Sequence, residues 1–305
     1  MQAGVGTSSG FGIGILLVGK ANLVMQIINW EPKVVEDYRR RILVDANNAL
    51  LAFKASRDRY TNLPNQRDYA GLPHLGSWRS EDALTWNVFR SLQQAGRLDI
   101  IAKELEIGNP RSLLLWGLAP EIDDISSELQ YVTGSLIRRF DGILPGQVTE
   151  PDAIILATSG IAVIECKLSE PDKAPTHLWE GTVNSVRKRR SIYQEELPRL
   201  INEDVSDEEM ARFYQLVRMA FFAMKLAMHF AVEPVVVSLG NEKNWSHKIR
   251  KIGKPPSELW EIFCSRILGD ESPRCEALTW QSIHILIEGE PLDTLSTYLS
   301  SHPCL

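Results

Sequence analysis

The chain has 305 residues, of which 44% are hydrophobic and 24% charged, and its formal net charge is −6. This composition is typical of a globular protein and excludes disordered, collagen-like and coiled-coil chains. The acidic balance excludes a polycation that coats nucleic acid, but it is compatible with a local basic groove. Cys166, Cys264, Cys275 and Cys304 form no CxxC pair. That pattern favours a reduced, cytoplasmic protein without structural zinc.

We interpret residues 1–24 as an amino-terminal extension whose status the sequence leaves open. Phe11 to Val18 is apolar, but Lys20 and Asn22 interrupt the run before the roughly 20 residues that a membrane-spanning helix needs. A secretory signal requires positive charge ahead of its apolar run, and residues 1–10 contain none. Two interpretations stay open: a natural start at Met25, or a short ordered segment. We expect no membrane partner.

The first half of the chain predicts helices followed by strands. Apolar residues recur at spacings of three and four between Val34 and Phe53, which predicts a helix. A loop rich in Gly and Pro follows over 57–79, and Ser80 is expected to cap a second helix. Short apolar runs predict strands at Ser112–Trp116 and Tyr131–Arg138.

The second half predicts a hairpin, a long helix and a buried strand. Ala153–Thr158 and Ile161–Cys166 flank a tight turn at Ser159-Gly160. A helix is expected over about 207–230, capped by Ser206 or Asp207, before a parallel-type strand at Pro234–Leu239. The tail predicts a helix near 257–268, a short run at 275–279, and helices from Trp280 and from Pro291. This order indicates an α/β domain over 80–305, preceded by a helix and loop over 25–79.

The hairpin carries the residues that indicate chemistry. Asp152 precedes its first strand and Glu165-Cys166-Lys167 ends its second, so antiparallel pairing brings Asp152 beside Glu165. Glu165 and Lys167 lie two residues apart and share one side of the strand, which we expect to face solvent. Two carboxylates and the Cys166 carbonyl make an oxygen site for Mg²⁺, with Mn²⁺ as a substitute. The Lys167 ammonium is then placed to orient the attacking water.

Pro151-Asp152 followed by Glu165-Cys166-Lys167 resembles the motif of the PD-(D/E)xK nuclease superfamily, the restriction-endonuclease-like fold. The resemblance covers about 80–240 and implies a mixed central β-sheet flanked by helices. It implies a Mg²⁺-dependent endonuclease that hydrolyses DNA, in bacterial defence, restriction or DNA processing. It also implies that Glu81 is a further metal ligand and that Gln215 lies on a helix against the active site. For Glu81 the alternative is a charge that serves the helix N-terminus, with Asp82 as its competitor.

Basic residues supply candidate contacts to nucleic acid. Arg187-Lys188-Arg189-Arg190 is the densest basic run, and Arg218 shares a helix face with Gln215. The alternative for each is a solvated or merely polar helix face. For the whole chain, the alternative is a catalytically silent nucleic-acid-binding or regulatory module of the same fold. RNA or branched nucleic acid, a homodimer and a partner protein also stay open.

Overall fold

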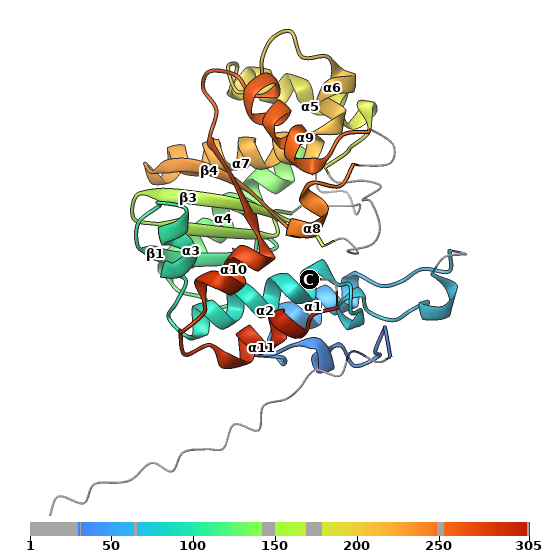
Figure 1. The fold of residues 1–305 in the computed structure, drawn as a ribbon. Coiled ribbons are helices and arrows are strands. Elements are labelled where there is room, and N and C mark those ends of the chain that lie inside the picture. Colours follow the sequence, from blue (N-terminus) through green and yellow to red (C-terminus); the bar gives the residue numbers. More distant parts are fainter. Residues whose placement is uncertain are drawn as a thin grey trace, which may run out of the picture.

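The computed structural model describes residues 30, 32–63, 66–141, 150–168, 179–248, 253–303 and 305. They form a five-stranded mixed sheet between two layers of helices (Figure 1). The strands lie side by side in the order of the chain: β1 (Pro110–Leu115), β2 (Ala153–Ala157), β3 (Gly160–Cys166), β4 (Glu233–Gly240) and β5 (Arg274–Thr279). The pairs β1–β2 and β2–β3 are antiparallel, whereas β3–β4 and β4–β5 are parallel. No helix among these residues is long and apolar enough to cross a membrane.

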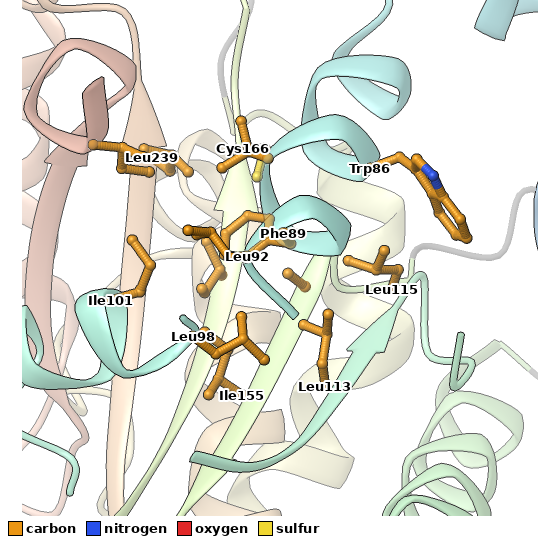
Figure 2. Close-up of a cluster of buried hydrophobic side chains, with 14 of the residues drawn as sticks. Trp86, Phe89, Leu92, Leu98, Ile101, Leu113, Leu115, Ile155, Cys166 and Leu239 are labelled. Carbon is orange, nitrogen blue, oxygen red and sulfur yellow. The ribbon is translucent and has the colours of Figure 1, made fainter. Parts of the chain in front are cut away.

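One face of the sheet is covered by helices from both ends of the chain: α1 (Ala49–Arg57), α2 (Glu81–Gln94), α3 (Asp99–Glu104), α10 (Trp280–Leu286) and α11 (Asp293–Ser301). Figure 2 shows Trp86, Phe89 and Leu92 of α2 among side chains from several strands. Ile42, Leu51 and Ala55 belong to the same hydrophobic cluster. The described part of the N-terminal segment therefore shares its core with the α/β domain.

The opposite face is covered by a second group of helices: α4 (Asp124–Asp141), α5 (Val183–Glu196), α6 (Asp207–Arg212), α7 (Tyr214–Phe230) and α9 (Pro256–Ile262). α7 lies against β3 and β4, where Ile161, Val163 and Val236 contact its apolar face. The short helix α8 (Glu242–Trp245) follows β4. Because both faces of the sheet are buried, β2 and β3 read as continuous apolar runs instead of alternating ones.

The predicted hairpin, the strand before it and the parallel strand after it are confirmed. Ala153 pairs with Ile164 and Leu156 with Ile161 across the β2–β3 hairpin, and Ile164 pairs with Val237 in β4. The Ser80 hydroxyl accepts a hydrogen bond of 3.0 Å from the amide of Ala83, so Ser80 caps α2 as expected. Ser206 likewise caps α6, through a capping box with Glu209.

Residues 131–138 are helical, so the prediction of a strand there is wrong. They belong to α4, which begins where Asp123 and Ser126 exchange hydrogen bonds between side chains and amides. Leu129, Thr133 and Leu136 are buried at spacings of four and three, the pattern of a helix that packs on one side.

Other predicted helices are shorter than expected. Residues 34–53 contain only a 3₁₀ helix at Tyr38–Arg41 and the start of α1, because Asp45 adopts a positive φ and Asn48 caps α1. The helix expected over 207–230 breaks at Phe213, between α6 and α7. The helix expected near 257–268 comprises α9 and a π-helical turn at Phe263–Ile267. Helices α3, α5 and α8 were not predicted from the sequence, and the extension 1–24 lies outside the described residues.

Candidate active site

The hairpin brings Asp152 and Glu165 to the same end of the sheet. Asp152 directly precedes β2, and Glu165 lies near the end of β3. The main-chain amide of Cys166 donates a hydrogen bond of 2.7 Å to Oδ2 of Asp152. This bond fixes the orientation of the Asp152 carboxylate and leaves its Oδ1 available for a cation.

Lys167 connects the end of β3 to the start of α2. Its Nζ lies 2.6 Å from Oε1 of Glu165 and 3.8 Å from Oε2 of Glu81. The amide of Leu168 donates to Oε1 of Glu81 at 2.8 Å. The main chain of Lys167 is held on both sides, since its amide donates to the carbonyl of Leu239 at 2.7 Å and its carbonyl accepts from Trp280 Nε1 at 3.2 Å. Glu81 therefore contacts the acid–lysine motif directly, whereas Asp82, whose charge also raises the pKa of Asp152, pairs with Lys54.

Glu165 is buried, so the prediction of a solvent-facing side is wrong. Only 3% of the residue is exposed. Ile161 and Val163 pack against the layer that contains α7, and Glu165 continues their side of β3. Its register partner in β4 is Ser238, which is also buried. The sequence predicted a helix over about 207–230 but not that it covers this side of β3.

The crowded carboxylates change the proton affinities of the site. Burial, and then the neighbouring charge of Glu165, raise the pKa of Asp152 well above its usual range. Burial also raises the pKa of Glu81. For Lys167 burial acts in the opposite direction, but Glu165, Glu81 and Asp152 outweigh it and raise its pKa. The site thus disfavours its own negative charge and favours cations.

The donor chemistry fits a hard divalent cation. Asp152, Glu165 and Glu81 offer carboxylate oxygens, the ligands that Mg²⁺ prefers. Within the part of the chain that the structure describes, however, no three acidic, His or Cys side chains stand in a metal-binding arrangement. The Lys167 ammonium contacts Glu165 and Glu81 instead. Cys166 points its side chain into the hydrophobic cluster of Figure 2, where burial raises the pKa of its thiol, so sulfur ligation does not fit.

A buried lysine next to the site, Lys54, was not predicted from the sequence. Lys54 Nζ lies 3.1 Å from Asp82 and 3.2 Å from Asp58, and 4.8 Å from the centre of the Trp116 ring. Burial would lower its pKa, but Asp82 and Asp58 raise it. The available signal was a lysine on the helix face that also carries Leu50 and Leu51. Lys54 thus pairs with Asp82, while Glu81 contacts Lys167.

Gln215 and Arg218 occupy the first turns of α7. Since α7 ends just before Glu233, which pairs with Gly160, its beginning lies toward the Glu165 end of β3. Gln215 is half-buried, and its main-chain amide donates to the carbonyl of Trp179 at 3.0 Å. Arg218 is fully buried, with its guanidinium 5.5 Å from the Phe222 ring. Gln215 therefore lies toward the end of the sheet that carries Glu165, as expected, whereas Arg218 is buried in the protein interior.

The basic run lies on α5, and its members differ in environment. Arg187 and Arg190 bind the two carboxylate oxygens of Asp207 at 3.1 and 2.8 Å. The Arg189 guanidinium lies 5.8 Å from the Tyr214 ring. Lys188 is exposed and has no acidic partner among the described residues. Two arginines of the run thus fasten α5 to α6, and only Lys188 projects freely.

A mixed sheet between two helix layers, with Asp152 and Glu165-Cys166-Lys167 at one hairpin end, defines a protein of the restriction-endonuclease-like class. A family model described as "restriction endonuclease associating with ARP" matches residues 29–302, and the chain belongs to this family. Searches of curated proteins and of solved structures found no match. The superfamily resemblance and the α/β fold are thereby confirmed, and the family is one of nucleases.

Proposed function

We propose that the chain is a Mg²⁺-dependent endonuclease that hydrolyses phosphodiester bonds of DNA. The observation that supports this proposal is the convergence of Asp152, Glu165, Lys167 and Glu81 at one end of the sheet. The family description, which names a restriction endonuclease, is the reason to prefer DNA over RNA or branched nucleic acid.

Each residue of the site has a distinct proposed role. Asp152 and Glu165 hold the metal ion, with Glu81 as a further oxygen ligand and the Cys166 carbonyl between them. When bound, Mg²⁺ would supply charge neutralisation at the phosphate and a lowered pKa for water. Because its pKa is raised, Lys167 keeps its proton at neutral pH. It therefore acts as a cation and hydrogen-bond donor toward water and phosphate, not as a general base. Gln215, from α7, is proposed to position these groups.

The test is cleavage of plasmid, linear and single-stranded DNA with Mg²⁺ or Mn²⁺ and with EDTA. We expect cleavage that EDTA abolishes and that Asp152→Asn loses. Asp99→Asn is a matched control, because Asp99 is an exposed acid on α3 that pairs with Arg97. Cleavage that survives EDTA, or that persists in the Asp152 variant, would refute the proposed mechanism.

One observation favours a second candidate, a catalytically silent DNA-binding module. The ion pair of 2.6 Å between Lys167 and Glu165 takes up an oxygen that a metal ion needs. The module would bind DNA with no cleavage in either metal and without a calorimetric signal for Mg²⁺. A Mg²⁺ signal that Glu165→Gln removes would decide for the enzyme.

The family description also names an association with ARP. We propose that this chain has such a partner and that the partner contributes to cleavage or to its control. The cleavage assays should therefore be repeated with the partner added. Activity that is identical with and without it would argue against a role for the partner in catalysis.

A further inference from the structure

A groove opens beside the candidate active site, where the edge strand β1 ends. Its volume is about 640 Å³, a size typical of ligand sites. It lies between α1, the turn after β1, α4 and the segment that precedes β2. The residues that matter for its chemistry are Phe53, Arg57, Trp116, Tyr131, Arg138 and Glu150.

Large apolar side chains stand exposed around this groove. Phe53 is 48% exposed, Tyr131 72% and Ile122 78%, and all three line it. A cluster of exposed large apolar side chains around one hollow is a common mark of a binding surface. Two of the three are aromatic, so flat apolar ligands suit the surface better than aliphatic ones do.

The wall formed by α4 combines an aromatic ring with a cation. Tyr131, Gly134 and Arg138 lie at spacings of three and four and so share one helix face. The Arg138 guanidinium lies along this wall, because its Nη1 packs against Gly134, 3.5 Å from where a side-chain Cβ would be. It donates to the Ser135 hydroxyl and has no acidic partner among the described residues.

The opposite wall carries a cation that is already neutralised. Arg57 donates to both carboxylate oxygens of Glu150 at 2.8 Å each, and its guanidinium lies 5.4 Å from the Phe53 ring. The groove therefore offers two exposed aromatic rings and one available positive charge, on Arg138. A flat, apolar group with an adjacent negative charge complements this surface.

Two lining residues of the groove, Trp116 and Glu150, connect it to Asp152 of the acid–lysine site. The amide of Trp116 donates to the carbonyl of Asp152 at 3.2 Å, and Glu150 precedes Asp152 by two residues. Trp116 is fixed in place, since its ring stacks on Trp86 at 6.0 Å. It adopts a φ of 52°, which is unusual for a bulky residue. A strand that lies in the groove would thus continue toward Asp152.

We propose that this groove binds unpaired nucleobases of the DNA strand that is presented to Asp152 and Glu165. The bases stack on Tyr131 and Phe53, and Arg138 contacts an adjacent phosphate. This inference rests on the proposed function and specifies its substrate: single-stranded or locally unpaired DNA. Every base has a π-face that can stack on an aromatic side chain, but in a duplex these faces are covered by neighbouring bases.

The test measures DNA binding in EDTA, so that it does not depend on cleavage. Fluorescence anisotropy compares a single-stranded oligonucleotide with a blunt duplex of the same sequence. We expect Tyr131→Ala to weaken single-strand binding about tenfold and duplex binding much less. Tyr131→Phe keeps the ring and should restore binding. A 2-aminopurine base in the single strand should be quenched by the wild-type protein and less by Tyr131→Ala.

A matched control is Met228→Ala, which removes another exposed large apolar side chain, at the far end of α7 from the site. It should leave binding of both DNAs unchanged. Equal weakening of single strand and duplex by Tyr131→Ala would overturn the inference. So would unchanged DNA binding with a changed molar mass by light scattering, which would assign the groove to a protein contact. Single-strand binding through Tyr131 in a protein that never cleaves DNA would support the groove while refuting the proposed nuclease activity.

Discussion

The amide of Cys166 donates a hydrogen bond of 2.7 Å to the Asp152 carboxylate, across the open end of the β2–β3 hairpin. The bond holds Asp152 in an orientation that its own repulsion with Glu165 would otherwise oppose. The donor is a main-chain group, so the side chain at position 166 can change without loss of this hydrogen bond. The carboxylate is thus positioned before any cation binds, while its charge remains unfavourable.

The unfavourable charge of Asp152 predicts that Asp152→Asn stabilises the metal-free protein at neutral pH. A pKa that is higher in the folded than in the unfolded state means that stability is lost as pH rises through the folded value. Asparagine removes that penalty, and its side-chain oxygen can still accept from the Cys166 amide. We expect the unfolding free energy in EDTA to rise by about 1 kcal/mol, measured by urea denaturation. Added Mg²⁺ should reverse the order, because only the wild type gains binding energy.

Asp99→Asn is the control for this measurement and should match the wild type with and without Mg²⁺. An Asp152 variant that is less stable than the wild type in EDTA would show that the carboxylate is well compensated in the free protein. The proposed electrostatic strain would then be wrong.

Removal of the Lys167 charge should separate turnover from metal binding. Lys167→Met leaves the carboxylates in place but deletes the ammonium that contacts Glu165 and Glu81. We expect turnover to fall by about 10²-fold or more, whereas Mg²⁺ affinity measured by calorimetry is equal or higher. Mg²⁺ should also raise the Tm of the variant more than that of the wild type, because the ion takes the place of the lost cation. A variant that cuts DNA at the wild-type rate would show that another group positions the water.

The basic run on α5 predicts two different outcomes from two substitutions. Lys188 projects into solvent, so Lys188→Ala should weaken DNA binding and reduce the salt slope by about one unit, with an unchanged Tm. Arg190 binds Asp207 and the carbonyl of Val205, so Arg190→Ala should lower the Tm and leave the salt slope nearly unchanged. Measurement of binding at several salt concentrations, with a melting curve for each variant, distinguishes them. Equal salt slopes for the wild type and both variants would mean that Lys188 does not contact phosphate.

The acid–lysine site was predictable from the sequence because its geometry is local. Two apolar strands and a Ser159-Gly160 turn place Asp152 beside Glu165 whatever the rest of the chain does. Glu81 was predicted only through the resemblance to a known superfamily. It lies 84 residues before Glu165, and the sequence alone does not show which distant segments contact each other. Lys54 and Trp116 reach the site only through packing between distant segments, so their roles were missed.

The errors in the fold have physical causes as well. The strand predicted at 131–138 ignored the Asp123–Ser126 cap and the spacing of Leu129, Thr133 and Leu136. Helix α5 was missed because it is polar nearly all round, with Val186 and Tyr193 as its buried residues. The burial of Glu165 depends on α7, which covers the strand from outside the hairpin. The pattern of one strand therefore cannot show whether a side chain at its end is exposed or buried by a distant helix.

The buried His302 predicts a loss of stability in acid that is independent of the catalytic site. The residue follows α11, is 5% exposed and meets the Trp30 ring edge-on, with the ring centres 4.7 Å apart. Burial, and then the charge of Arg41, lower its pKa to about 3. The folded state therefore binds fewer protons than the unfolded state between pH 6.5 and about 3. The stability that the neutral ring contributes is complete above pH 6.5 and is lost as pH falls through this window.

The expected cost is about 1.4 kcal/mol for each pH unit below 6.5, or about 2 kcal/mol at pH 5. His302→Phe keeps an aromatic ring but cannot take up a proton. Between pH 7.5 and 5, its unfolding free energy should therefore fall by about 2 kcal/mol less than that of the wild type. Urea denaturation at a series of pH values measures the difference. His247→Gln, a change at an exposed histidine, is the control and should follow the wild-type curve. Parallel curves for the wild type and His302→Phe would mean that the protonated imidazolium is accommodated in the folded state.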